Sequence, residues 1–244
     1  MKKVYGLIGK NIDYSFSRKY FANKFSKEQL PCEYKNFDIE NVSDFNQLRK
    51  IKNIKGFNVT IPYKEAILSL VDELDPIAEN IGAINVIRIT NEGKTIGYNS
   101  DYYGFAHALL PYLPENYKLN ALILGTGGAS KAVKYALQTL RIPYSTVSRK
   151  PSATQLSYSD INKDLLIHNQ LIINTTPLGT YPEINQSPNL PYNYITSNHI
   201  LYDLIYNPER TSFLNYGKQN GATIINGEKM LILQAEKSWE IWNL

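Results

Sequence analysis

The chain has 244 residues, of which 43% are hydrophobic and 20% charged; this is the composition of a folded globular protein and excludes general disorder. Lysine and arginine together number 26 and aspartate and glutamate 22, and this small excess without a dense basic run argues against nucleic-acid binding. The single cysteine excludes an internal disulfide framework and a cysteine-rich zinc site, and no apolar run reaches the roughly 20 residues that span a bilayer. We therefore expect a cytoplasmic protein without a membrane partner.

Short apolar runs alternate with segments of helical spacing over the first hundred residues. We predict strands at 4–8, 34–39, 56–61, 84–89 and 94–98, and helices at 18–30, 44–51 and 62–71. Pro62 favours the last of these helices, because proline suits the first helical turn. Strands that alternate with helices predict an α/β architecture.

A second unit of the same kind follows. We predict strands at 121–124, 145–148, 171–173, 200–204 and 222–225, and helices at 102–110, 129–140, 211–219 and 228–242. The helix at 129–140 is amphipathic, with apolar residues at i, i+3, i+4 and i+7. Because no low-complexity linker separates the two units, we place the boundary near Asp101.

A glycine-rich turn, Gly125-Thr126-Gly127-Gly128-Ala129-Ser130, connects one of these strands directly to the amphipathic helix. Glycines in this place allow a tight turn and let the backbone approach a pyrophosphate, whose charge meets the helix N-terminus. The spacing departs from the strict G-x-G-x-x-G pattern, because Ser130 occupies the last position. The turn indicates a dinucleotide site, and the alternative is an ordinary tight turn between a strand and a helix.

The end of the following strand indicates which dinucleotide binds. Arg149 and Lys150 stand there, where NAD sites usually carry an acidic residue for the ribose 2′-hydroxyl. An arginine can instead hold a 2′-phosphate through two parallel donors. The pair therefore favours NADP, and the alternative is a solvated basic turn.

Two further stretches join a predicted strand to a predicted helix and end in charged residues. Lys64 falls in the first turn of the helix predicted at 62–71, where a cation opposes the helix dipole, and this misfit suggests another use. Asp101 follows Asn99 and Ser100, and its alternative role is that of a helix cap. Considered together, an ammonium can protonate an oxygen that gains charge, and a carboxylate can orient that ammonium.

Eight motifs in this order resemble the shikimate dehydrogenase family nearly from end to end. Asn58-Val59-Thr60-Ile61-Pro62-Tyr63-Lys64, for example, matches the family's Asn-Val-Thr-x-Pro-x-Lys, and Gly82-Ala83-Ile84-Asn85 matches Gly-Ala-x-Asn. The eight stretches are 15–17, 58–64, 82–85, 97–105, 125–130, 174–179, 203–211 and 230–234.

The resemblance implies a fold, an activity and partners. It implies an α/β protein with an N-terminal substrate-binding domain at 1–101, which the C-terminal helix at 228–244 rejoins, and a Rossmann-like NADP domain at 102–227. The implied reaction is the reversible, NADPH-dependent reduction of 3-dehydroshikimate to shikimate in aromatic amino acid (chorismate) biosynthesis. It implies a cytoplasmic monomer or homodimer that needs no metal.

The resemblance also implies roles for individual residues. Lys64 and Asp101 are the expected catalytic pair. The residues expected to bind the substrate are Ser15, Ser17, Thr60, Asn85, Asn99, Tyr206 and Gln234. The residues expected to bind the cofactor are Gly125, Gly127, Gly128, Ala129, Ser130, Ser148, Arg149, Lys150, Thr176, Pro177, Leu204, Gly227 and Met230.

Some positions depart from the family pattern. Arg18 stands where the family usually has proline, and Gly227-Glu228-Lys229 replaces its Gly-Leu-Gly. Two other functions stay open. One is a broader quinate/shikimate dehydrogenase that uses NAD, against which Arg149 counts. The other is a non-catalytic shikimate-sensing module, against which the presence of both Lys64 and Asp101 counts.

Overall fold

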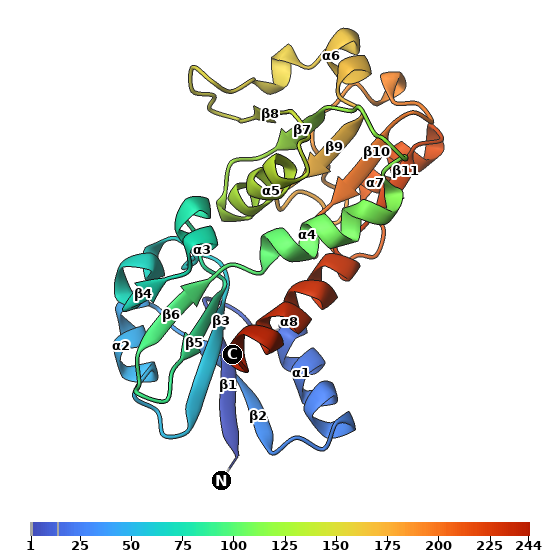
Figure 1. Cartoon of the computed structure of the whole chain (residues 1–244). Helices are drawn as coiled ribbons and strands as arrows, with labels where there is room; N and C mark the ends of the chain where they lie inside the picture. Colours follow the sequence, from blue (N-terminus) through green and yellow to red (C-terminus); the bar gives the residue numbers. More distant parts are fainter. Residues whose placement is uncertain (1, 14) are drawn as a thin grey trace. The chain divides into compact units, whose positions relative to one another are not determined.

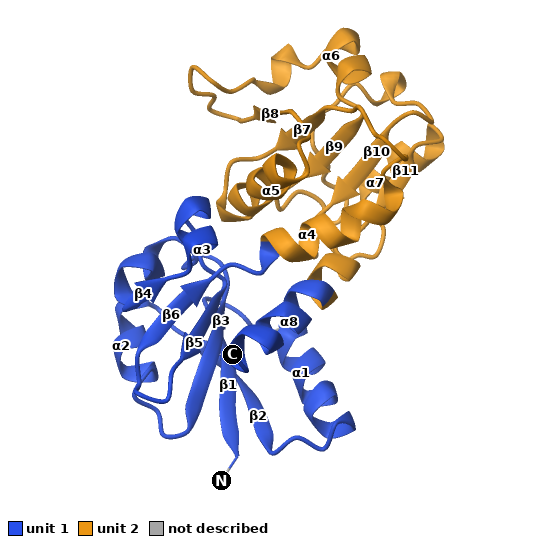
Figure 2. Cartoon of the chain, in the orientation of Figure 1, with its two compact units in different colours: residues 1–101, 233–244 blue, residues 102–232 orange. Residues whose placement is uncertain are grey.

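The structure is a computed structural model that describes residues 2–13 and 15–244 (Figure 1). The backbone divides into two compact units, shown in Figure 2. Unit 1 comprises Met1–Asp101 and Leu233–Leu244, and unit 2 comprises Tyr102–Ile232. The division falls inside the last helix, α8 (Glu228–Trp242), so this helix contributes its first turn to unit 2 and the rest to unit 1.

Unit 1 is built on a six-stranded mixed sheet of order β2-β1-β3-β5-β6-β4. Its strands are β1 (Lys3–Gly9), β2 (Cys32–Asp38), β3 (Ile54–Val59), β4 (Glu73–Leu74), β5 (Val86–Ile89) and β6 (Thr95–Tyr98). β1 runs parallel to β2 and β3, whereas β5 runs antiparallel to both β3 and β6. As a result, the C-terminal ends of β1, β3 and β6 lie at the same edge of the sheet as the start of β5.

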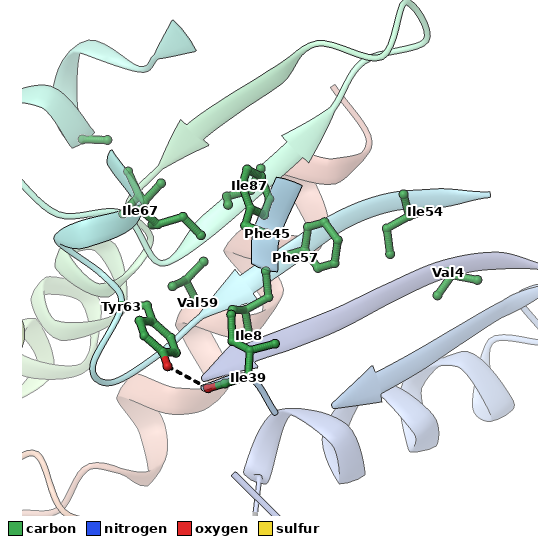
Figure 3. Close-up of a cluster of buried hydrophobic side chains, with 12 residues drawn as sticks. Val4, Ile8, Ile39, Phe45, Ile54, Phe57, Val59, Tyr63, Ile67 and Ile87 are labelled. Atoms are coloured by element: carbon green, nitrogen blue, oxygen red, sulfur yellow. Dashed lines mark hydrogen bonds between the residues drawn. The ribbon is translucent and has the colours of Figure 1, made fainter. Parts of the chain in front are cut away.

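Buried side chains from the strands and helices of unit 1 form its core. The helices are α1 (Phe16–Lys27), α2 (Phe45–Leu48), α3 (Pro76–Ile81) and the larger part of α8. In the cluster of Figure 3, Ile8, Phe57 and Ile87 come from β1, β3 and β5, and all three are fully buried. Trp242 of α8 donates from its indole nitrogen to the Ile87 carbonyl at 3.0 Å, which anchors α8 to the sheet.

The helix predicted at 62–71 is wrong. The Ile61-Pro62 peptide is cis, turns follow, and the only helical residues there form the 3-10 helix η2 (Ala66–Leu70). The Lys64 carbonyl accepts a hydrogen bond from the Ile84 backbone nitrogen at 2.9 Å. This carbonyl is therefore bound to a distant segment, and Lys64 does not oppose a helix dipole as the sequence suggests.

Unit 2 contains a five-stranded sheet of order β11-β10-β9-β7-β8, in which every neighbouring pair is parallel. Its strands are β7 (Ala121–Leu124), β8 (Tyr144–Val147), β9 (Leu171–Asn174), β10 (Ile200–Asp203) and β11 (Thr223–Ile225). All residues of β7, β9 and β10 are buried, as expected for parallel strands covered on both faces. β8 lies on one side of β7 and β9 on the other, so the strand order reverses beside β7.

The helices of unit 2 are α4 (Asp101–Leu109), which begins at the last residue of unit 1, α5 (Gly128–Thr139), α6 (Lys163–His168) and α7 (Ser212–Gln219). The remaining 3-10 helices of the chain are η1 (Val42–Asp44), η3 (Leu110–Tyr112), η4 (Tyr158–Asp160) and η5 (Tyr192–Tyr194). Among the described residues, no helix is long and apolar enough to cross a membrane. The α/β fold expected from the alternating pattern is confirmed, although the sequence did not predict α3, α6 or β4.

Candidate active site

The mixed sheet of unit 1 gathers polar side chains from three distant parts of the chain. Thr60 follows the end of β3, Asn85 precedes β5, and Asn99 follows the end of β6. The Val59 nitrogen donates to the Asn85 carbonyl at 2.8 Å, and the Asn85 nitrogen donates to the Tyr98 carbonyl at 3.0 Å. These backbone bonds hold the three strand ends in register, so their polar residues share one edge of the sheet.

Lys64 and Asp101 form an ion pair at this edge. The Lys64 Nζ lies 2.8 Å from the Asp101 Oδ2, and 18% and 9% of the two side chains are exposed. Asp101 Oδ1 accepts a second bond from the Asn85 Nδ2 at 2.8 Å, and the Asp101 backbone nitrogen donates to the Asn99 Oδ1 at 3.0 Å. Both carboxylate oxygens are therefore held, and such charge-assisted bonds are the strong ones.

A buried polar network continues beneath this pair. The Ser100 nitrogen donates to the Asn85 Oδ1 at 2.6 Å, and the hydroxyls of Ser100 and Ser238 lie 3.3 Å apart. The Asn58 Nδ2 donates to the Ser238 Oγ at 2.9 Å, and the Tyr34 hydroxyl donates to the Asn58 Oδ1 at 2.8 Å. The structure thus assigns to Asn85 a second task, which is to orient Asp101 and Ser100.

The C-terminal helix contributes Gln234, which the sequence analysis named, and Ser238, which it missed. Gln234 of α8 places its Oε1 3.4 Å from both the Asn85 Nδ2 and the Ser100 Oγ. Ser238 lies four residues later, on the same face of the helix, and its hydroxyl donates to the Gln234 carbonyl at 2.8 Å. That spacing is the only signal in the sequence that could have indicated Ser238.

The two serines predicted to bind the substrate lie at the N-terminus of α1. The Ser15 Oγ accepts from the Arg18 nitrogen at 3.3 Å and so caps the helix. A proline at position 18 would lack this N–H, so the substitution adds a cap bond to Ser15. Burial raises the pKa of Tyr34, and a hydrogen bond with Ser17 offsets part of this rise. Ser17 is thereby connected to the network beneath Lys64.

In unit 2, the glycine-rich turn leaves the N-terminus of α5 open. Gly125 has φ +111, and a Cβ there would lie 2.7 Å from the Thr175 Oγ1. A Cβ on Gly127, the N-cap residue, would have no heavy atom within 4 Å. The first turn of α5 has neither an acidic residue nor a side-chain cap, and the Ser130 hydroxyl donates to the Gly127 carbonyl at 2.7 Å. The turn therefore fits the phosphates of a dinucleotide, which helix N–H groups attract.

The basic pair after β8 lies at the same edge of the sheet, because β7 and β8 are parallel neighbours. The Ser148 hydroxyl accepts from the Lys150 nitrogen at 3.2 Å and donates to its carbonyl at 3.1 Å, which shapes the turn. Arg149 and Lys150 are exposed, and neither forms a side-chain ion pair with a described residue. Burial raises the pKa of Tyr158, and the charge of the nearby Arg149 lowers it.

The remaining residues predicted to bind the cofactor follow three parallel neighbours, β9, β10 and β11. Thr176 and Pro177 come after β9, Leu204 comes after β10, and Gly227 and Met230 come after β11. Thr176 donates to the Asn174 Oδ1 from its backbone nitrogen at 3.0 Å and from its hydroxyl at 2.7 Å. A Cβ on Gly227 would lie 2.1 Å from the Leu204 carbonyl oxygen, so this glycine is required for packing. Pro177 is exposed, Leu204 is half-buried, and Met230 is buried.

Tyr206 is 37% exposed, and burial raises its pKa. It belongs to unit 2, whereas Ser15 and Ser17, its expected partners in binding a carboxylate, belong to unit 1. Within the part of the chain that the structure describes, no group of three or more His, Cys, Asp or Glu residues is placed to hold a metal ion.

The family assignment follows from two comparisons. A family model for the shikimate dehydrogenase substrate binding domain matches residues 7–87. The shikimate dehydrogenase (NADP(+)) of Clostridium botulinum is 41% identical over 249 residues, which cover 98% of this chain and 96% of that protein. The chain belongs to the shikimate dehydrogenase family.

Solved structures agree with this assignment. A crystal structure of a shikimate dehydrogenase in complex with NADP+ superposes with a TM-score of 0.87 at 34% identity, covering 99% of this chain and 90% of the other. The shikimate 5-dehydrogenase of Thermus thermophilus in complex with NADP(H) and shikimate has a TM-score of 0.87 at 27% identity, with 98% and 93% covered. The predicted family, the class of NADP-dependent oxidoreductase and the cofactor NADP are confirmed.

Proposed function

We propose that this shikimate dehydrogenase catalyses the reversible reduction of 3-dehydroshikimate to shikimate through Lys64 and Asp101. The observation that carries the proposal is the 2.8 Å contact between the Lys64 Nζ and the Asp101 Oδ2. Hydroxyl and amide side chains surround this pair at one sheet edge, which suits a substrate with several hydroxyl groups. The Thermus thermophilus relative is described with NADP(H) and shikimate bound, which supports the same pair of reactants here.

The chemistry that NADPH supplies when bound is transfer of a hydride to the substrate carbonyl carbon. The chain's own contribution is at the oxygen. We assign to the Lys64 Nζ the transfer of a proton, or a strong hydrogen bond, to the oxygen that becomes an alkoxide. Asp101 Oδ2 holds the ammonium in place, and Asn85 holds the other oxygen of Asp101. In the reverse direction, Lys64 takes the proton back from the hydroxyl.

The binding roles rest on the same reasoning. The substrate carboxylate is assigned to Ser15 and Ser17 with Tyr206. Its ring hydroxyls and carbonyl are assigned to a separate set, namely Thr60, Asn85, Asn99, Asp101 and Gln234. Support comes from the shared sheet edge and the network, which bring this second set together within unit 1.

For the cofactor, the residues that would hold NADP are those at the C-terminal edge of the parallel sheet. The backbone of Gly127, Gly128 and Ala129 would hold the pyrophosphate, with Gly125 and Ser130 shaping the turn. Arg149 and Lys150 would bind the 2′-phosphate. Ser148, Thr176, Pro177, Leu204, Gly227 and Met230 complete the site. The open N-terminus of α5 supports this assignment, and so do the exposed side chains of Arg149 and Lys150, which form no ion pair with a described residue.

We further propose that unit 1 binds the substrate and unit 2 binds NADP. The match of the substrate binding domain model to residues 7–87 supports the first assignment, and the strand reversal beside β7 supports the second, because such points bind dinucleotides. The single free cysteine suits the reducing cytoplasm, which we propose as the compartment. A monomer or a homodimer stays our prediction for the assembly, and light scattering tests it.

The test is a spectrophotometric assay of NADPH formation from NADP and shikimate, with quinate and NAD as the alternative reactants. We expect kcat/KM to be highest for the combination of shikimate and NADP. Equal or better turnover of quinate with NAD would instead indicate the broader quinate/shikimate enzyme. Binding of shikimate without any turnover would indicate a sensing module and contradict the proposal.

A further inference from the structure

Asp203 is a fully buried carboxylate at the end of β10 that the proposed reaction does not use. Within the described residues, no lysine, arginine or histidine pairs with it. Burial raises its pKa to about 7, against the lowering effect of its hydrogen bonds with Thr211, Ile205 and Asn174. Burial of a carboxylate without a cation is costly unless hydrogen bonds replace its water. The hydrogen bonds of Asp203 therefore compensate for its burial.

These bonds come from the loop that follows β10 and from the last residue of β9. The Asp203 Oδ2 accepts from the hydroxyl of Thr211, eight positions further along the chain, at 2.6 Å. The Asp203 Oδ1 accepts from the Asn174 Nδ2 and from the Ile205 nitrogen, each at 3.1 Å. One carboxylate therefore closes the loop 203–211 upon itself and ties it to the end of β9.

The two side chains that bind Asp203, Asn174 and Thr211, connect it to residues of the proposed site. Asn174 binds the backbone nitrogen and the hydroxyl of Thr176 with its Oδ1, which sets the turn that carries Thr176 and Pro177. Thr211 also accepts from the Leu214 nitrogen at 3.3 Å and so caps α7. The closed loop 203–211 contains Leu204, assigned to the cofactor, and Tyr206, assigned to the substrate carboxylate.

We propose that Asp203 is a positioning residue that, through Asn174 and Thr211, holds the loops at 174–178 and 203–211 in the conformation that binds NADP and the substrate carboxylate. This inference rests on the proposed function, because it takes the roles of Thr176, Leu204 and Tyr206 from there. Asp203 touches neither reactant, and its effect passes through the backbone of the two loops.

The experiment uses the full-length protein and three variants. Thr211→Val removes the hydroxyl that binds Asp203, Thr211→Ser keeps it, and Asn162→Ala is the matched control. Asn162 caps α6 in the same unit by accepting from the Leu165 nitrogen at 2.9 Å, so its loss removes a helix cap without touching either loop. Thr211→Val is preferred to Asp203→Ala, because it leaves the buried carboxylate two of its three donors.

Three quantities are measured for each variant: kcat and KM with shikimate and NADP, NADP affinity by isothermal titration calorimetry, and hydrogen exchange of peptides that cover 203–211. In Thr211→Val we expect kcat/KM to fall by roughly tenfold or more, weaker NADP binding and faster exchange in the loop. We expect Thr211→Ser to retain values within about threefold of the wild type, and Asn162→Ala to lower the melting temperature alone.

The inference is overturned if Thr211→Val and Asn162→Ala lower the melting temperature alike while KM, NADP affinity and loop exchange stay at wild-type values. That result would make Asp203 purely structural. If the wild type turns over no shikimate, the proposed function fails, and calorimetry and hydrogen exchange then decide the inference by themselves. Unchanged loop exchange and NADP binding in Thr211→Val would then reject it.

Discussion

Asp203 makes the free energy of unfolding depend on pH in a direction that is unusual for a carboxylate. Burial raises its pKa in the folded state to about 7, from the ordinary aspartate value of 3.8. Between these two values the unfolded chain has lost the proton while the folded chain keeps it. The folded state binds more protons there, so stability falls as pH rises. The contribution is fully present below the unfolded pKa and is lost as pH passes through 7.

The magnitude follows from the same two values. One pKa unit corresponds to about 1.4 kcal/mol, and between pH 5 and pH 8 the folded carboxyl titrates almost completely. From pH 5 to pH 8 the free energy of unfolding of the wild type is therefore expected to fall by about 2–3 kcal/mol more than that of an Asp203→Asn variant, in which position 203 cannot ionise. Tyr192 also interacts electrostatically with Asp203, and because burial raises the pKa of Tyr192 it stays neutral over this range.

The assay is urea unfolding of the wild type and Asp203→Asn at pH 5 and pH 8, followed by circular dichroism. Hydrogen exchange of peptides from β10 confirms that the difference belongs to unit 2. The other titrating groups are common to both proteins, so the difference between the two pH slopes isolates Asp203. Parallel changes in the two proteins, with slopes that differ by less than about 0.5 kcal/mol over this interval, would refute the raised pKa and its cause in burial.

Lys64→Ala is expected to lower kcat by about 10²–10⁴-fold with a smaller change in shikimate KM, because it removes the proton donor held by Asp101. Steady-state kinetics test this. A variant that keeps more than about half of the wild-type kcat would show that Lys64 has no part in the mechanism. Arg149→Ala is expected to weaken NADP binding by about 10–150-fold with little change for NAD, since paired donors to a phosphate are worth about 1.5–3 kcal/mol. Adding Lys150→Ala should erase most of the remaining preference, and an unmoved ratio of the two KM values in the double variant would reject the 2′-phosphate assignment. Ser238→Ala should lower the free energy of unfolding by about 1–3 kcal/mol, because one buried N–H of Asn58 loses its acceptor and Ser100 loses one of its hydroxyl contacts. Unfolding followed by tryptophan fluorescence reports on unit 1, and an equal loss in Ser238→Thr, which keeps the hydroxyl, would contradict this explanation.

Most strands and helices could be predicted in order from the sequence, because hydrophobic period and turn residues report local structure; α3, α6 and β4 were missed. The strand at 121–124, the glycine turn and the helix after it were placed within one residue of β7 and α5. Lys64 and Asp101 were identified from motif residues together with the family resemblance. The helix expected after Pro62 failed because the Lys64 carbonyl bonds to Ile84, a partner twenty residues away that no local pattern reveals.

Only the tertiary structure decided how these residues meet. The antiparallel insertion of β5 between β3 and β6 brings Asn85 to Asp101, and strand order is set by contacts between distant segments rather than by hydrophobic period. Ser238 reaches the network only because α8 packs against the sheet of unit 1. Asp203 looks in the sequence like one more motif residue. Its role depends on burial and on hydrogen-bond donors 8 and 29 residues away. A carboxylate loses its water only when the chain folds, and only then does it need these donors as replacements.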